Sequence, residues 1–236
     1  ATGALVAPDS YYGRIREICD QYGILLIYDE VMTGAGRTGK YFACEHWGIT
    51  PDILAVSKGL AAGYAPLGAM IAPDRIVGPV LDHGGFIHGY TYAGNPLACA
   101  AGNAVLDVID EDGLLENAAA SGAALKAELS KLSDEFTMIG DVRGKGLLLA
   151  VELVKDRTSM EPIDPKHMAA ARLVDIAYDK GLIIYWRRTR GGYRGDHVMV
   201  CPPMTIKPEQ FDDILVPLRA ALVELQDELA TAGAFS

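Results

Sequence analysis

The chain has 236 residues, of which 50% are hydrophobic and 22% are charged, and its formal net charge is −10. This length and composition predict one large globular domain or two smaller ones. The acidic balance argues against a nucleic-acid-binding protein, which would need a basic face. No apolar run approaches the roughly 18 residues that a membrane-spanning helix requires, so we expect no membrane partner.

The four cysteines, Cys19, Cys44, Cys99 and Cys201, lie far apart and form no CxxC pair. A zinc or redox motif is therefore not indicated, and free thiols in a reducing cytoplasm are the simpler interpretation. The chain starts with ATGALVAPDS, which has neither an initiator Met nor the pattern of a signal peptide. It resembles an internal stretch of a protein, and we expect a cytoplasmic location.

The first part of the chain alternates helical and strand-like patterns. Residues 9–23 have apolar positions at helical spacing and end at Gly23. The run ILLIYDEV (24–31) is typical of a strand buried on both faces of a parallel sheet, and runs at 52–57 and 67–73 predict two more strands. This alternation predicts an α/β sheet covered on both sides.

The pattern changes after two further expected helices, at 95–111 and 113–132. We place a boundary near residue 133, so that residues 1–133 form an α/β part and residues 134–236 a smaller α+β domain. The expected elements of the second part are two strands within 135–154 joined near Gly144, a helix at 164–181, strands at 181–186 and 197–203, and a helix from about 208 to 229.

The stretch GAGRTGK (34–40) fits two phosphate-binding patterns, GxGxxG and GxxxxGK. The second pattern needs a Ser or Thr next to hold magnesium, and this chain has Tyr41. The first needs a glycine at the strand end and a long helix afterwards, but Asp29 to Thr33 intervene and only a short segment precedes Pro51. We therefore reject both nucleotide interpretations in favour of a tight backbone turn.

Two polar residues stand where predicted strands end. Asp29 closes ILLIYD, and Lys58 follows ILAVS. Ligands of open α/β sheets bind outside the carboxyl ends of the strands, so this carboxylate and this amine could face one cavity. One interpretation is a partly buried ion pair. The other is a reactive amine that forms a Schiff base, and pyridoxal phosphate would use both residues, because its aldehyde needs a lysine and its pyridine nitrogen an anion.

Four segments resemble class III aminotransferases, which have the pyridoxal-phosphate fold type I. They are YDEVMTGAGRTGKYFACEHWGITPDILAVSKGL, GYTYAGNPLACAAG, VRGKGLLLAVEL and the CPP turn near the C-terminus. The resemblance covers essentially the whole chain, and the order DEV, GRTG, SKGL and TxxGNPLAxAA makes it specific. It implies the C-terminal part of the large, mostly parallel α/β domain, followed by the small α+β domain.

The resemblance also implies roles for individual residues. Lys58 would form the internal aldimine and carry the proton between carbon centres, Asp29 would pair with the pyridine nitrogen, and Val31 would pack on the ring. Thr91, with Tyr90 and Gly89 beside it, would reach the cofactor phosphate of a neighbouring subunit, which requires at least a dimer. Without the resemblance, a local turn bond is the simpler interpretation of Thr91.

Arginines are the candidates for binding a substrate carboxylate, because a guanidinium matches it in bidentate geometry. Many relatives that use a keto acid have an arginine shortly before a GD pair, and this chain has YWRRTRGGYRGD. Arg190 and Arg194 are the candidates; a solvated basic loop is the alternative for each. Arg143, in DVRGKG, resembles a family arginine or is a structural arginine.

The family's chains are about twice this long, so the resemblance implies that the N-terminal half is absent here. That half carries the loop around the cofactor phosphate, the aromatic residue that stacks on the ring and half of the substrate pocket. A sheet without it would expose a buried strand edge. We expect a partner, either the N-terminal half of the same protein or a second chain.

The expected activity is transfer of an amino group from an amine or ω-amino acid to a keto acid such as pyruvate or 2-oxoglutarate. Two alternatives stay open. One is another reaction on the same scaffold, such as that of an aminomutase or a decarboxylase. The other is a non-catalytic or complementing subunit of a split enzyme, against which the intact pair Lys58 and Asp29 argues.

Overall fold

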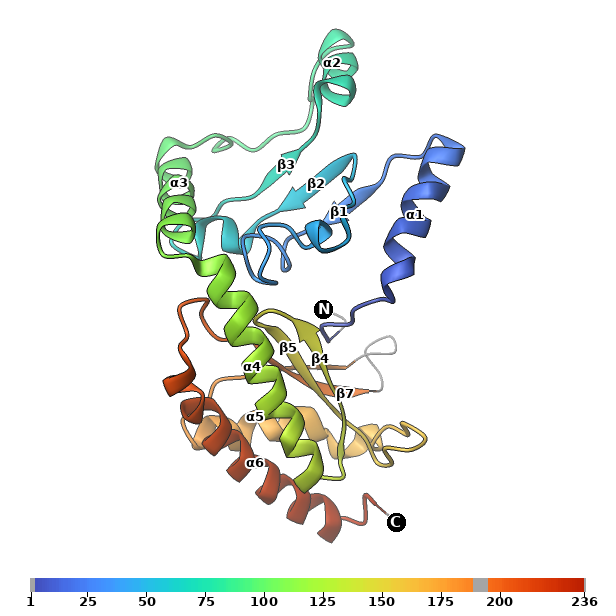
Figure 1. The fold of residues 1–236 in the computed structure, drawn as a ribbon, viewed down its shortest axis with the longest axis vertical. Helices are drawn as coiled ribbons and strands as arrows, with labels where there is room; N and C mark the ends of the chain where they lie inside the picture. Colours follow the sequence, from blue (N-terminus) through green and yellow to red (C-terminus); the bar gives the residue numbers. More distant parts are fainter. Residues whose placement is uncertain (1–2, 189–194, 236) are drawn as a thin grey trace. The chain divides into compact units, whose positions relative to one another are not determined.

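The computed structural model describes residues 3–188 and 195–235 and divides the chain into two compact units. The first unit comprises Ala7–Glu116. The second unit combines the N-terminal segment, up to Val6, with the chain from Asn117 onward (Figure 1). Among the described residues, no helix combines the length and the apolar character needed to cross a membrane. The expected boundary near residue 133 concerns the whole protein and stays a prediction.

The first unit begins with helix α1, as its apolar spacing predicts. Gly23 ends this helix in the left-handed conformation, with φ = 65°, which glycine adopts without steric cost. Asn95 caps helix α3, because its side chain accepts hydrogen bonds from the N–H groups of Leu97 and Ala98. The elements are α1 (Asp9–Tyr22), β1 (Ile27–Asp29), η1 (Ala43–Trp47), β2 (Ile53–Val56), η2 (Lys58–Ala61), β3 (Ala69–Ile71), α2 (Asp74–Asp82) and α3 (Pro96–Glu111), where η denotes a 3₁₀ helix.

The three strands form one sheet in the order β1-β2-β3. Strand β1 pairs with β2 in parallel, and β3 pairs with β2 antiparallel. The expectation that residues 24–31 are buried on both faces is wrong within this unit: Leu26 is buried, but Ile24 is 54% and Ile27 59% exposed. The first unit has few large apolar side chains to cover this sheet, since many of its buried residues are alanines and cysteines.

The carboxylate of Asp52 connects three elements of the first unit. It accepts hydrogen bonds from the Leu26 N–H at 2.8 Å and from Arg16 at 2.9 Å, and it pairs with Arg75 on α2. These donors lower the pKa of Asp52, with the Leu26 N–H as the largest contribution. The sheet and two helices are therefore tied together at the amino end of β2.

The second unit contains a four-stranded sheet in the order β4-β5-β7-β6, in which every pairing is antiparallel. The turn expected near Gly144 is confirmed: it lies directly after Lys145, the last residue of the first strand of the hairpin. The elements are α4 (Leu114–Glu135), β4 (Ile139–Lys145), β5 (Leu148–Leu153), η3 (Pro165–His167), α5 (Ala169–Asp179), β6 (Tyr185–Arg188), β7 (Asp196–Val200), η5 (Pro208–Gln210) and α6 (Asp212–Thr231).

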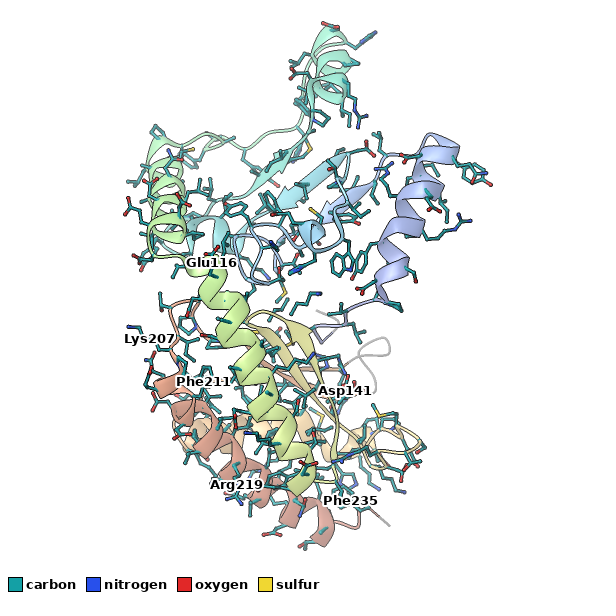
Figure 2. The ribbon with its side chains drawn as sticks, viewed as in Figure 1. Glu116, Asp141, Lys207, Phe211, Arg219 and Phe235 are labelled. Atoms are coloured by element: carbon teal, nitrogen blue, oxygen red, sulfur yellow. The ribbon has the colours of Figure 1, made fainter. Side chains whose placement is uncertain are left out.

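The large hydrophobic core lies in the second unit, where side chains of α4, α5 and α6 pack with those of β4, β5 and β7. Helices α5 and α6 lie side by side (Figure 1). Phe211, at the start of α6, is buried in this core, and Phe235, beyond the end of α6, packs against it (Figure 2). Since burial of apolar surface dominates folding stability, most of the described stabilisation comes from this unit.

Candidate functional site

Asp29 and Lys58 stand at the carboxyl ends of neighbouring parallel strands. Asp29 is the last residue of β1 and lies opposite Ala55 of β2, three residues before Lys58. Both side chains are exposed. Within the described part of the chain they form no ion pair with each other, so the expected alternative of a partly buried ion pair is not what this arrangement provides. A carboxylate and an amine are both available to a third group.

The backbone of Lys58 adopts the left-handed conformation, with φ = 46°. A residue with a Cβ is strained there, at a cost of about 1–2 kcal/mol, and such strain often occurs at functional sites. The residues beside Lys58 fix this turn. Ser57 Oγ donates to the Leu67 carbonyl at 2.9 Å, and Lys58 begins the short helix η2. The lysine therefore has a defined backbone position, and its ammonium forms no ion pair with any residue that the structure describes.

The Asp29 carboxylate is fixed by its own backbone turn. Its Oδ1 accepts a hydrogen bond from the Val31 N–H at 3.0 Å, and the Glu30 N–H donates to the Ala55 carbonyl at 2.8 Å. The first bond orients Asp29, and the second extends the pairing of β1 with β2 past the end of the strand. Val31 is half-buried beside them.

The N–H groups of three glycines in the loop 34–40 donate to nearby backbone carbonyls. Gly34 donates to the Glu30 carbonyl at 2.9 Å, Gly36 to the Tyr41 carbonyl at 3.2 Å, and Gly39 to the Gly36 carbonyl at 2.9 Å. A phosphate-binding loop would need such donors free and convergent. The geometry agrees with the tight-turn interpretation of this stretch.

Tyr90 and Thr91 lie in an exposed segment between α2 and α3. They belong to the first of two tight turns, in which the Ala93 N–H donates to the Tyr90 carbonyl at 2.9 Å and the Asn95 N–H to the Tyr92 carbonyl at 3.1 Å. The Thr91 hydroxyl makes no hydrogen bond to any described residue. The local turn bond that we considered for Thr91 is therefore not formed here.

Arg143 belongs to a buried cluster in the second unit. Its Nη1 pairs with Glu152 and lies 3.0 Å from Asp141, which Figure 2 marks on β4. Its Nε donates to the Gly3 carbonyl at 2.6 Å, so Arg143 holds the N-terminal segment on the sheet. These contacts favour the structural interpretation of this arginine. The candidates Arg190 and Arg194 lie outside the described residues.

His197 is a completely buried member of the same cluster, and sequence reasoning missed it. Burial lowers the pKa of His197 because it disfavours the charged imidazolium, and the nearby Arg143 cation acts in the same direction. A signal was available, since His197 lies within an apolar strand directly after Asp196. A polar residue inside an apolar run indicates a titratable group that is buried with the strand.

This buried histidine predicts a pH dependence of stability. Because its pKa in the folded state is lowered, the unfolded state binds more protons below about pH 6.5. The stabilisation is fully present above that pH and is lost as the pH falls. We expect denaturant unfolding of the second unit in the intact protein to show a lower free energy at pH 5.5 than at pH 7.5. His197→Leu should flatten this difference, and the exposed control His88→Gln should retain it; an unchanged difference in His197→Leu would contradict the assignment.

Comparison with known proteins identifies the chain's relatives. The family model for aminotransferase class III matches residues 1–222. A leucine/methionine racemase of Thermococcus litoralis is 39% identical over 95% of this chain and 48% of its own length. An adenosylmethionine-8-amino-7-oxononanoate aminotransferase of Geobacter sulfurreducens is 38% identical over 94% of this chain and 48% of its own.

A solved structure shows the same fold. The amine transaminase from an uncultivated Pseudomonas species, in its PLP-bound form, is 40% identical and superposes with a TM-score of 0.86. The match covers 94% of this chain and 50% of that one. The chain thus spans about half the length of the relatives it matches.

Proposed function

Because the chain belongs to the class III aminotransferases, a family that depends on pyridoxal phosphate, we propose that it is the C-terminal half of an enzyme that transfers an amino group from an amine or ω-amino acid to a keto acid. The supporting observation is the pair formed by Asp29 and Lys58 at adjacent strand ends, neither of which forms an ion pair with a described residue. In the pyridoxal-phosphate chemistry proposed here, an amine forms a covalent bond with the cofactor's carbonyl carbon. A carboxylate pairs with the protonated ring nitrogen. The described residues fit that group.

Pyridoxal phosphate, when bound, supplies an electron sink that stabilises negative charge on the substrate carbon. We assign Lys58 Nζ as the group that holds the cofactor covalently and, once released from it, moves the proton at the substrate carbon. Asp29 provides the negative charge that keeps the ring nitrogen protonated, and Val31 packs against the ring. Thr91 and Tyr90 would contact the cofactor phosphate of a neighbouring copy, in a dimer or larger assembly.

The same proposal includes a partner that supplies the rest of the site. Apolar side chains on both edge strands are exposed in the first unit, among them Ile27 on β1 and Met70 and Ile71 on β3. Exposed apolar patches of this kind mark association surfaces. We propose that the N-terminal half, in the same or a separate chain, covers them and completes the phosphate and substrate subsites.

The half-reactions test this proposal in the intact holoenzyme. With benzylamine or β-alanine and no acceptor, we expect one equivalent of carbonyl product per site. Addition of pyruvate or 2-oxoglutarate should then release one equivalent of alanine or glutamate. Absence of both products with every donor tried would refute amino transfer.

A racemase is the second candidate, because the Thermococcus litoralis relative carries that name. It would use the same proton transfer at Lys58 but no acceptor. Conversion of L-leucine to D-leucine without any keto acid, together with no carbonyl product, would favour this reaction.

A further inference from the structure

Glu30 is a buried carboxylate that the proposed chemistry does not use. It follows Asp29 directly and is only 2% exposed. Its Oε1 accepts a hydrogen bond from the Cys44 N–H at 2.9 Å, its Oε2 accepts one from Thr33 Oγ1, and its carbonyl accepts one from the Gly34 N–H at 2.9 Å. Burial of a carboxylate is costly unless its oxygens are paired in this way. Glu30 therefore holds both ends of the loop between Thr33 and Cys44.

The loop held by Glu30 is closely packed. Gly34, Ala35 and Gly36 are buried, and Ala35 is in the left-handed conformation with φ = 52°. A Cβ at position 34 would lie 2.7 Å from the Glu30 carbonyl oxygen, closer than real Cβ atoms approach such an atom. The position of Ala35 is thus set by Glu30 and by the loop's own backbone.

Ala35 in turn contacts the residue after the proposed cofactor lysine. A Cβ at Gly59 would lie 2.9 Å from the Ala35 Cβ, and every other neighbouring atom would be at least 3.7 Å away. Gly59 also has no left-handed backbone requirement of its own. Its lack of a side chain is explained by the Ala35 methyl group alone.

We propose that Glu30 and Ala35 are positioning residues for Lys58: Glu30 fixes the glycine loop, and the Ala35 methyl group packs on Gly59 and holds the strained turn that carries Lys58. In this proposal the GAGRTGK stretch serves to position Lys58 and does not bind a phosphate. The inference rests on the proposed function, because it concerns the lysine that would hold the cofactor.

The test exchanges the two small residues. Gly59→Ala introduces the collision, and Ala35→Gly removes the methyl group while relieving a left-handed alanine. In the intact holoenzyme we expect Gly59→Ala to lower kcat about tenfold or more and to shift the pH at which the visible cofactor absorbance titrates. The double variant should return kcat to within about threefold of the wild-type value. It should also return the titration midpoint of the absorbance close to that of the wild type. Gly78→Ala, at a glycine with open space around it, is the matched control and should change neither.

A purely structural contact would change the thermal midpoint without moving the titration. An unaltered titration and rate in Gly59→Ala would overturn the inference, and so would a double variant that restores neither folding nor spectrum. If the wild-type absorbance does not depend on Lys58, the proposed function fails and the inference fails with it. A Lys58-dependent absorbance that Gly59→Ala leaves unchanged overturns the inference alone.

Discussion

Lys58→Ala is expected to abolish amino transfer in the intact enzyme, with a loss of at least about 10⁴-fold in kcat. The variant removes both the amine that holds the cofactor and the group that moves the proton at the substrate carbon. The visible absorbance of the bound cofactor should disappear, while the fold should persist, because the Lys58 side chain is exposed and unpaired among the described residues. Replacement by Ala also leaves the local backbone strain in place.

The matched control is Lys40→Ala, which removes an exposed lysine from the neighbouring glycine loop. It should retain the wild-type rate and spectrum. A Lys58→Ala enzyme with an unaffected spectrum would refute the role of this lysine.

Asp29→Asn should reduce kcat by about 10²–10³-fold without unfolding the protein. Asparagine keeps an oxygen that can accept the Val31 N–H bond but loses the negative charge that would hold a proton on the cofactor nitrogen. This variant therefore removes the charge while it keeps the hydrogen bond that forms the turn. Asp29→Ala, which loses both, should show the same kinetic defect and a lower unfolding midpoint.

Asp82→Asn removes an exposed carboxylate at the end of α2 and serves as the control. A lower kcat with an unchanged unfolding midpoint in Asp29→Asn would show that the lost charge, and not a lost turn, causes the defect. A full rate in Asp29→Asn would contradict an electrostatic role for this residue.

Much of the second unit could be predicted from the sequence, because its apolar periodicity is satisfied by contacts within the unit. Helices α5 and α6 and strands β5 and β7 lie within or near the expected ranges. For the sheet of the first unit, the positions of the strands could be predicted, but the exposure of their side chains could not. A run such as ILLIYD indicates an apolar strand that other segments should cover. It does not indicate which segments cover it, because these can be far away in the sequence.

The candidate site shows the same division. Motif order and strand ends were sufficient to select Asp29 and Lys58. The contact of Ala35 with Gly59 could not be foreseen, because it depends on how a loop folds back on a turn more than twenty residues away in the sequence. The buried groups of Glu30 and His197 were also missed, since each lies inside an otherwise informative run and the residues around it come from other parts of the chain.

The most direct test of the central claim is to identify the residue that carries the cofactor. The intact holoenzyme is reduced with borohydride, digested, and mapped by mass spectrometry for a peptide that carries the pyridoxyl phosphate group. The account predicts that the modified residue is Lys58 and that the modification is lost in Lys58→Ala but retained in Lys40→Ala. Modification of a different lysine, or of none, would contradict it.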